Sequence, residues 1–356
     1  MSEAPVTGVV TAVRAGQGFD EAAAAAWLAP RIPALAGGFT VRQFEGGQSN
    51  PTFLLETGAR RWVLRKKPPG PLLASAHLIE REARVLGALA GTAVAVPGVV
   101  AYCADPAVIG SDFMVLEYID GRIFRDPALP GLAPAERTAI YQAAVDCLAD
   151  LHAVDWQARG LTGYGKPSAY VARQVARWQR QYEESCDRPI AAMAWLIDWL
   201  PRHLPPESPP AIVHGDFRLD NLVIARGSPR VAAVLDWELS TIGEPAADLA
   251  YFCITYHMGP TASALRGLAG LDLAALGIPD EAAVLARYAA RRGQPVLPPE
   301  HARWFVAFGL FRMAAIAAGI AARVRHGNAS SAEASAYAAQ AEPCAERARA
   351  LAEGLA

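Results

Sequence analysis

Two short motifs contain polar residues of the kinds that catalyse reactions. The first, IVHGDFRLDNLVI at residues 212–224, contains His214, Asp216 and Asn221, and the second, VLDWE, contains Asp236. Apolar residues on both sides of each motif favour short strands that end in polar loops. We therefore expect the ends of these strands to bring the four side chains together, with Asp236 at the same end of a hairpin.

Phosphoryl transfer is the chemistry that this set of side chains fits. The phosphates of ATP need cations, and the hydroxyl that attacks the γ-phosphate needs a proton acceptor. Asn221 and Asp236 offer hard oxygen ligands for Mg²⁺, and Asp216 can act as the catalytic base. His214 is expected to brace the loop. Each residue alone is more typical of a turn or a cap, but the combination favours catalysis.

The residues before these motifs predict a β-sheet with one helix. Alternating β-forming residues, interrupted by Gly and Pro, indicate several short strands, and apolar residues at helical spacing that stop at Gly91 indicate the helix. The strands are expected within residues 39–47, 51–57, 60–66, 96–103 and 112–119, and the helix within residues 77–91.

Beyond about Pro134 the pattern changes to long helical stretches, and only residues 212–235 return to a strand-like pattern. Strands followed by helices predict an α+β fold in two lobes. We expect a nucleotide-binding lobe at residues 1–118, a helical catalytic and substrate lobe at residues 119–356, and a ligand cleft at their boundary. The alanine-rich residues 330–356 are predicted to be helical.

The turn GGQSN at residues 46–50 joins two predicted strands. Its backbone N–H groups, together with Ser49 and Asn50, are candidates for contacting nucleotide phosphates. Small polar residues are also ordinary hairpin chemistry, so the turn is weak evidence by itself.

The third predicted strand, RRWVLRK, places alternate side chains on opposite faces. Val63 and Arg65 therefore share a face, where Val63 could cover an adenine and Arg65 could reach phosphate. Glu82 of the predicted helix is the expected ion-pair partner of Arg65, with Glu80 as the competing choice. A solvated charged face is the structural alternative.

MVLEYIDG, residues 114–121, is the predicted link between the lobes. Backbone groups of Glu117, Tyr118 and Ile119 are candidates for bonding an adenine edge, although an ordinary edge strand fits the same residues.

Two further polar residues favour structural interpretations. His152, on an apolar helix face, is more typical of a hydrogen-bonded core histidine than of a ligand or base. Asp248, in PAADLAY, is expected to start a helix or brace a loop.

Composition disfavours several other classes of protein. Lys+Arg number 33 against Asp+Glu 35, so no overall field favours nucleic acid or an anionic membrane as a partner, and a small molecule is the better expectation. The five cysteines lie far apart, which argues against a disulfide framework or a zinc site and for buried thiols in a reducing cytoplasm. The amino terminus shows no signal-peptide pattern.

The most apolar late segment, from Trp304 to Ile320, carries Arg312 near its middle. It is barely long enough to cross a bilayer, so we expect a buried helix there.

From about Phe44 to Tyr256 the chain resembles the aminoglycoside phosphotransferase and choline kinase family, whose members share the protein-kinase fold. HGDFRLDN, LDWE, VLRKKPPG and EYIDG are similar in particular to the phosphotransferase domain fused to acyl-CoA dehydrogenase modules. The resemblance implies that Asp216 is the base, that Asn221 and Asp236 bind magnesium, and that ATP lies between the lobes. Arg65 stands where many relatives have lysine, which keeps the charge but changes the geometry.

The resemblance leaves the phosphoryl acceptor open. Similarity to the dehydrogenase-linked domain implies a hydroxyacyl-CoA or hydroxy acid. A choline-like or aminoglycoside acceptor is the alternative, and it would need acidic or aromatic groups such as Trp178, Trp195, Trp199 or Trp237 in the pocket. Several arginines, namely Arg173, Arg177, Arg180, Arg287 and Arg312, could instead pair with an anionic acceptor. A pseudokinase that binds nucleotide without turnover is a further alternative, and the intact Asp216, Asn221 and Asp236 argue against it.

Overall fold

The computed structural model describes residues 8–45, 50–58, 60–68, 79–260, 265–325 and 332–355. The chain divides into two compact units, which we call the sheet unit and the helical unit. The sheet unit comprises Met1–Phe124, Trp156–Thr162 and Asp220–Ser240, and the helical unit comprises Arg125–Asp155, Gly163–Leu219 and Thr241–Ala356. This grouping by contacts does not test a lobe boundary between residues 118 and 119, which stays a prediction.

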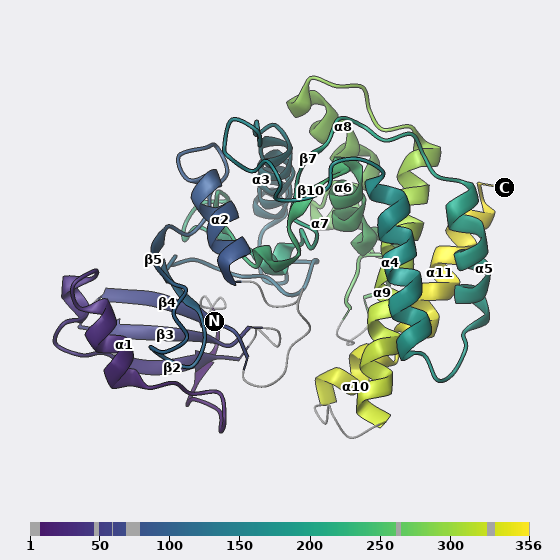
Figure 1. Cartoon of the computed structure of the whole chain (residues 1–356). Helices are drawn as coiled ribbons and strands as arrows, with labels where there is room; N and C mark the ends of the chain where they lie inside the picture. Colours follow the sequence, from purple (N-terminus) through teal and green to yellow (C-terminus); the bar gives the residue numbers. More distant parts are fainter. Residues whose placement is uncertain are drawn as a thin grey trace. The chain divides into compact units, whose positions relative to one another are not determined.

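The sheet unit is built on a six-stranded antiparallel sheet with strand order β1-β2-β3-β4-β6-β5 (Figure 1). The five strands predicted from the sequence are confirmed, and β1 was not predicted. The strands are β1 (Val10–Thr11), β2 (Thr40–Phe44), β3 (Thr52–Thr57), β4 (Arg60–Lys66), β5 (Val99–Cys103) and β6 (Phe113–Glu117).

Two helices pack against this sheet. Helix α1 (Glu21–Leu28), capped by Asp20, was not predicted and buries Leu28 in the cluster that contains Leu64 of β4. Helix α2 (Ile79–Leu89) was predicted, and its Glu82 pairs with Arg65. Leu64 and Arg65 therefore serve opposite faces of the sheet, as the alternation along β4 predicts.

A second hairpin of the sheet unit consists of β8 (Leu222–Ile224) and β9 (Val231–Val234). Leu222 pairs with Val234, and the Leu235 N–H donates to the Asn221 carbonyl at 2.8 Å. Asn221 and Asp236 therefore lie at the same end of this hairpin, as expected.

His214 and Asp216 do not belong to the β8/β9 hairpin but lie in the loop before β8, which was predicted between two short strands. They follow β7 (Ala211–Val213), which pairs with β10 (Thr241–Gly243) in the helical unit. The sequence does not reveal β10, because three residues ending in glycine carry no periodic pattern.

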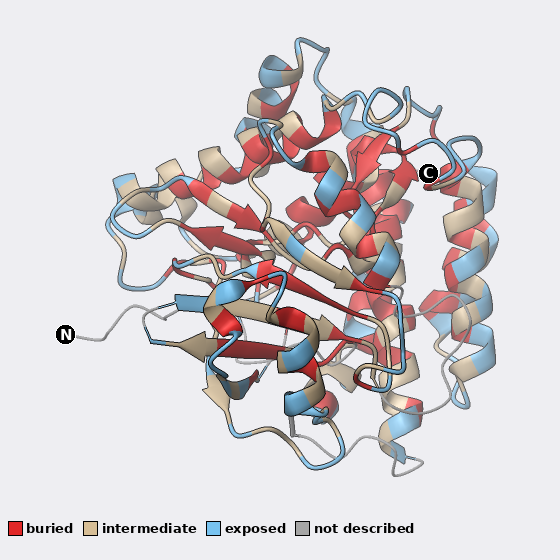
Figure 2. Ribbon diagram, turned by 60° about the vertical axis from the view of Figure 1, so that its left-hand side comes forward, coloured by how far each residue is buried: buried red, intermediate tan, exposed pale blue. Residues whose placement is uncertain are grey.

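In the helical unit, five helices (α4, α5, α6, α10 and α11) pack against the long helix α9, whose middle is buried, whereas α3 packs against α7 and α8. Figure 2 shows the buried residues in red. The run from Tyr170 to Leu200, predicted as helical, is divided at Cys186–Ile190 into α4 and α5, and the predicted terminal helix forms α10 and α11. The helices are α3 (Pro134–His152), α4 (Tyr170–Ser185), α5 (Ala191–Trp199), α6 (Pro245–Cys253), α7 (Leu273–Leu276), α8 (Glu281–Arg292), α9 (Pro299–Arg325), α10 (Ala332–Ala338) and α11 (Ala341–Glu353). Short 3₁₀ helices are η1 (Pro33–Leu35), η2 (Leu200–Arg202), η3 (Leu219–Asn221), η4 (Trp237–Leu239) and η5 (Ile254–His257).

Among the described residues, one helix, α9, is long and apolar enough to cross a membrane when judged by length and composition alone. In its most apolar 18-residue window, 72% of the residues are buried inside the protein. That burial is what the predicted core helix requires.

The five cysteines are free thiols. Cys103, Cys147, Cys253 and Cys344 are buried as expected, but Cys186 is only partly buried. It directly follows the last residue of α4, where the helix ends.

Candidate active site

The sheet unit contains a cluster of one arginine and three carboxylates. Arg65 Nη2 lies 2.8 Å from Asp236 Oδ1 and 3.5 Å from Glu238 Oε2, and Arg65 Nε lies 3.2 Å from Glu82 Oε2. The Arg65–Asp236 contact is a hydrogen bond, whereas the Nε approach to Glu82 is an ion pair without hydrogen-bond geometry. Glu82 is therefore the partner of Arg65, and the competing choice of Glu80 is wrong.

Burial and charge shift the pKa values of the two most enclosed members. Burial lowers the pKa of Arg65, but the carboxylates of Glu82, Asp236 and Glu238 outweigh it and leave that pKa above its ordinary value. Burial raises the pKa of Glu82 to about 7, and the charges of Asp236 and Glu238 act in the same direction. Arg65 and a hydrogen bond from the Trp237 backbone oppose this rise. The cluster therefore keeps an excess of negative charge at neutral pH.

Asp236 has a left-handed backbone conformation, with φ 64° and ψ 65°, which is uncommon for a residue other than glycine. It stands between the end of β9 and the start of η4. Such conformations cost free energy and persist where surrounding structure imposes them, often at functional sites. Here the conformation directs the chain from the hairpin into the turn that carries Glu238.

The donor set at this end of the β8/β9 hairpin fits a divalent cation. Asn221 and Asp236 supply amide and carboxylate oxygens, which are the ligands that Mg²⁺ accepts. The Asp236 side chain is 34% exposed, so solvent and a bound ion can reach it. One guanidinium against three carboxylates also leaves the site short of positive charge.

The predicted adenine-binding segment follows β6. The Glu117 N–H donates to the Gly98 carbonyl at 2.9 Å, so this donor is not available to a base. Within the described part of the chain, no hydrogen bond from the Ile119 N–H is present. The Tyr118 ring lies 4.0 Å below the guanidinium of Arg61. An adenine contact through Glu117, Tyr118 and Ile119 stays a prediction, with Ile119 N–H as its best donor.

The remaining predicted nucleotide residues are Val63 on β4, and Ser49 and Asn50 before β3. Val63 pairs with Leu54 and Leu116 in the sheet. Asn50 is buried, and its Nδ2 donates to Glu238 Oε2 at 3.3 Å. Ser49 lies outside the described residues. Asn50 therefore belongs to the polar network around Arg65, and its contact with phosphate stays a prediction.

The helical unit holds the loop that carries the predicted base. His214 and Gly215 donate their backbone N–H groups to the two carboxylate oxygens of Asp248, with 2.8 Å between Gly215 N and Oδ1. Gly215 has φ 83°, which places it in the region that favours glycine. The Asp216 N–H then donates to His214 Nδ1 at 3.2 Å. Asp248 and His214 thus brace the loop, as expected for both.

Asp248 is buried and is held by a further chain of hydrogen bonds. His152 Nε2 lies 3.4 Å from Asp248 Oδ2, and His152 Nδ1 lies 2.6 Å from the Tyr288 hydroxyl. Burial raises the pKa of Asp248, but His152, His214 and the Gly215 N–H outweigh it and leave that pKa below its ordinary value. Asp248 therefore stays ionised, and His152 is the hydrogen-bonded core histidine that the sequence predicts.

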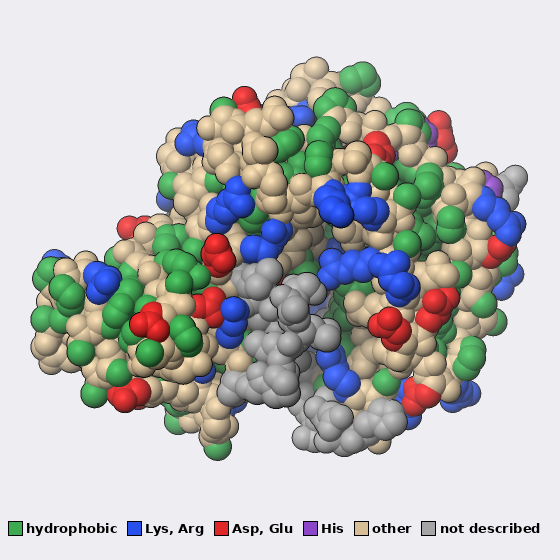
Figure 3. Space-filling model, viewed as in Figure 1, with side chains coloured by type: hydrophobic (Ala, Val, Ile, Leu, Met, Phe, Trp, Pro, Cys, Tyr) green, Lys and Arg blue, Asp and Glu red, His purple; other side chains and the backbone are tan. Residues whose placement is uncertain are grey.

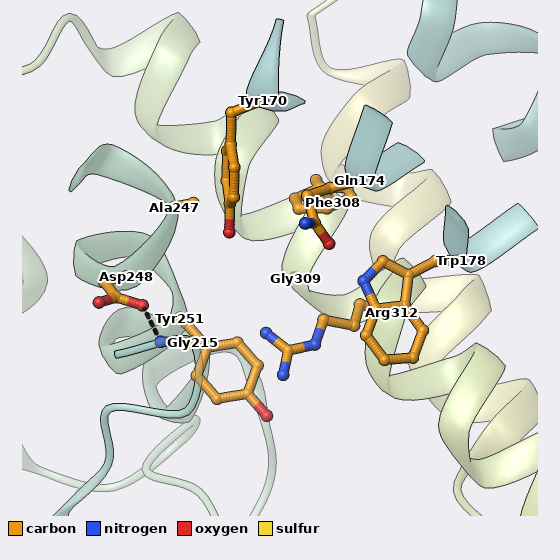
Figure 4. A pocket seen from close by; sticks show the side chains of 10 residues that line it. All are labelled: Tyr170, Gln174, Trp178, Gly215, Ala247, Asp248, Tyr251, Phe308, Gly309 and Arg312. Carbon is orange, nitrogen blue, oxygen red and sulfur yellow. Dashed lines mark hydrogen bonds between the residues drawn. The ribbon is translucent and has the colours of Figure 1, made fainter. Parts of the chain in front are cut away.

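The carboxylate of Asp216 is accessible, with 20% of its side chain exposed, and its Oδ1 lies 3.4 Å from Arg218 Nε. Gly215, on the same loop, lines a small recess that is partly open to solvent (Figure 4). Asp248 also lines this recess, but its carboxylate is engaged by the loop backbone. A hydroxyl compound bound in the recess would lie next to the loop of the predicted base.

Sequence reasoning missed several residues of these sites. Glu238 lies two positions after the predicted metal ligand Asp236, and Arg218 lies two positions after the predicted base Asp216, so their proximity could have been noticed. Tyr170, Gln174 and Tyr251 line the recess from helices α4 and α6, and no local pattern links residues so far apart in the sequence.

Comparison with known proteins gives consistent results for family and fold. Residues 40–293 match the model of the phosphotransferase enzyme family. A crystal structure from Ralstonia eutropha, which carries a provisional aminoglycoside phosphotransferase name, is 47% identical, covers 95% of this chain and 99% of its own, and gives a TM-score of 0.85.

More distant or longer proteins are also similar. Mouse acyl-CoA dehydrogenase family member 10 is 46% identical over 298 residues, which are 84% of this chain but only 28% of the mouse protein. The chain thus spans well under half of this relative. Aminoglycoside phosphotransferase APH(4)-Ia, solved as a ternary complex with AMP-PNP and hygromycin B, is 15% identical with a TM-score of 0.59 over 93% of this chain and 98% of its own.

The last of these similarities shows the fold alone, which is the two-lobed protein-kinase-like α+β fold predicted from the sequence. The match to the family model covers most of the chain, and the Ralstonia structure matches nearly all of it. This chain belongs to the phosphotransferase enzyme family.

Proposed function

We propose that this protein transfers the γ-phosphate of ATP to a hydroxyl group of a small hydroxyacyl compound, either a hydroxyacyl-CoA or a hydroxy acid. The observation that carries the proposal is the fixed loop of Asp216. Two backbone N–H groups of this loop are bound by the buried carboxylate of Asp248, while the Asp216 carboxylate itself stays accessible. An accessible carboxylate on a rigid loop is what a catalytic base requires.

In this proposal Asp216 orients the acceptor hydroxyl and accepts its proton. Asn221 and Asp236 would hold Mg²⁺, which when bound neutralises the charge of the nucleotide phosphates. Arg65 keeps Asp236 in place through their 2.8 Å hydrogen bond and is itself fixed by Glu82. The nucleotide base would contact the segment from Glu117 to Ile119. Support for nucleotide use comes from the fold, because a structural neighbour binds AMP-PNP.

The hydroxyacyl acceptor is suggested by the similarity to acyl-CoA dehydrogenase family member 10. A choline-like or aminoglycoside acceptor would need free acidic or aromatic groups to bind its positive charge. The carboxylate lining the recess, Asp248, is already engaged, and the faces of Trp178 and Tyr251 are already approached by the guanidinium of Arg312. The described residues of the recess therefore favour an acceptor that is not a cation.

Magnesium-dependent release of ADP from ATP tests the proposal. The acceptors would be 3-hydroxybutyryl-CoA, 3-hydroxybutyrate, choline and an aminoglycoside, each with the wild-type protein and the Asp216→Asn variant. Turnover with a hydroxyacyl compound that collapses in the variant supports the proposal. Turnover with only the cationic acceptors overturns the acceptor class, and nucleotide binding without any turnover supports a non-catalytic binding protein.

A further inference from the structure

The recess beside the Asp216 loop contains an arginine that has no anionic partner among the described residues. Arg312 extends from α9 into the recess, with its guanidinium between Tyr251 and Trp178 (Figure 4). The guanidinium carbon lies 5.0 Å from the centre of the Trp178 ring and 4.8 Å from that of Tyr251. Among the described residues, no carboxylate lies within 4.0 Å of Arg312, and its Nε is buried without a hydrogen-bond partner.

A second arginine lies near the same Trp178 ring. The guanidinium of Arg177, on α4, lies 5.4 Å from the same Trp178 ring and forms no ion pair with a carboxylate of the described residues. Burial lowers the pKa of Arg177, and the positive charge of Arg312 lowers it further. Figure 3 shows that Lys and Arg side chains also gather on the face over α4.

Two like charges close to each other destabilise a fold unless something compensates them. Here Arg312 is partly buried and Arg177 is exposed. Two other arginines of the helical unit are compensated by carboxylates. Arg287 pairs with Asp146 and Arg291 pairs with Asp150, each through two hydrogen bonds. Arg312, by contrast, lines the recess with no counter-charge among the described residues, and a ligand in the recess could provide it.

The two arginines belong to the surroundings of the predicted base. The negative charge of Asp216 acts on the Tyr251 hydroxyl and helps to raise the pKa of that residue, although burial is the larger cause. Tyr337 of α10 is close enough to Asp216, Arg218 and Arg312 for all three charges to act on it. An anion held by Arg312 would thus lie close to the loop that carries Asp216.

We propose that Arg312, supported by Arg177 and by the ring of Trp178, binds an oxyanion of the phosphoryl acceptor and so selects anionic hydroxyl compounds. The oxyanion is a carboxylate or a phosphate, because both accept hydrogen bonds from a planar guanidinium. This inference rests on the proposed function, since it assigns the acceptor to this recess. Arg312 is a specificity-determining residue in this proposal, and the proton transfer stays with Asp216.

The test is the Arg312→Met variant, which keeps the length of the side chain and removes its charge. Its matched control is Arg323→Met, the same change at an exposed position of the same helix. For each protein, kcat/KM would be measured with 3-hydroxybutyrate, with 3-hydroxybutyryl-CoA and with the neutral 1,3-butanediol. We expect Arg312→Met to lose about tenfold to a hundredfold in kcat/KM for the anionic acceptor that the wild type prefers, mainly through KM. The loss for the diol should be much smaller.

Calorimetric titration of 3-hydroxybutyrate and of free CoA into the same three proteins gives a second readout that needs no turnover. Binding of 3-hydroxybutyrate that is lost in Arg312→Met identifies a carboxylate as the anion, and loss of CoA binding identifies a phosphate. If the wild type binds one of these anions through Arg312 but releases no ADP, the anion site stands and the proposed phosphoryl transfer fails.

Unchanged kcat/KM and unchanged binding in Arg312→Met would overturn the anion site and leave Arg312 as a packing residue between two aromatic rings. A wild-type preference for the diol would overturn it as well. If Arg312→Met does not fold, two other variants replace it. Arg177→Met removes the charge of the exposed neighbour, and Arg312→Lys keeps the charge of Arg312 without its planar guanidinium. Both should show the same anionic selectivity loss in weaker form.

Discussion

Arg65 Nη2 lies 2.8 Å from Asp236 Oδ1, so the strand β4 arginine holds the carboxylate that is the predicted metal ligand. The same arginine contacts Glu82 and Glu238. It therefore serves as the counter-charge for a carboxylate site before any nucleotide binds. A lysine at this position would keep one positive charge, but it lacks the separate nitrogens with which the guanidinium contacts different carboxylates.

Replacing Arg65 with Met should destabilise the protein by about 1 to 3 kcal/mol at neutral pH, because the buried Glu82, whose pKa is already raised to about 7, loses its counter-charge and must take up a proton. Glu82 is only 2% exposed, so water cannot take over the role of Arg65. Chemical denaturation measures the loss. The double variant Arg65→Met/Glu82→Gln should recover part of it, and a double variant no more stable than the single one would contradict this account.

Replacing Asp216 with Asn should reduce ADP release by about 10²- to 10⁴-fold, which is the usual contribution of a general base. The change keeps the size of the side chain and its place on the braced loop, so the fold should be unaffected. Asp198→Asn, at an exposed carboxylate of α5, is the control and should keep wild-type rates. An Asp216→Asn protein that is folded and fully active would exclude Asp216 as the base.

The elements that the sequence predicts well are those with a long or regular pattern. The strands β2, β3 and β4 and helix α2 repeat apolar residues at a fixed period, and helix α9 is a long, nearly continuous apolar run. The Arg65–Glu82 pair follows from placing Glu82 on the helix after the strand. Helix α1 was missed although Asp20 caps it, because its run of alanines shows no apolar face that stands out from the rest.

The acceptor recess could not be predicted in the same way. Tyr170, Tyr251 and Arg312 come from three helices, and which face of each helix turns inward depends on tertiary packing. In the sequence, Arg312 was a charge within an apolar helix and one of five arginines that could pair with an anionic acceptor. What distinguishes it from a surface arginine is its place in the recess, with no carboxylate of the described residues within 4.0 Å, which only the arrangement of the helices reveals.

Gly121→Ala should destabilise the sheet unit. A Cβ at Gly121 would lie 2.4 Å from Val223 Cγ1 and 2.6 Å from the Ile224 carbonyl oxygen. The neighbouring Arg122 exchanges two backbone hydrogen bonds with Ile224, so the chain cannot easily move away. Overpacking of this kind costs about 1 to 3 kcal/mol.

Thermal and chemical denaturation measure this effect, and Gly87→Ala is its matched control. Gly87 lies in α2, and a Cβ there meets nothing within 4 Å, so alanine should stabilise the helix by about 0.5 to 1 kcal/mol. Equal stabilities of the two variants would show that the Gly121 contact with the β8/β9 hairpin is loose.

Replacing Asp248 with Asn should make stability less dependent on acid pH. The wild-type carboxylate accepts hydrogen bonds from the His214 and Gly215 backbones and contacts His152. Asn retains only one acceptor oxygen, so the variant should be less stable by about 1 to 3 kcal/mol at neutral pH. It should also lower kcat, because the Asp216 loop loses its brace.

The stabilising contribution of Asp248 should decrease as the pH falls. The pKa of Asp248 lies below its ordinary value of 3.8 in the folded protein, so the folded state favours the ionised form. Its stabilising contribution is therefore complete above the unfolded pKa and is lost as the pH falls through the folded pKa. Urea denaturation of both proteins between pH 7 and pH 3 should show the stability difference shrinking at the acid end. A difference that stays constant to pH 3 would mean that the His214 and Gly215 N–H groups do not depend on the charge of Asp248.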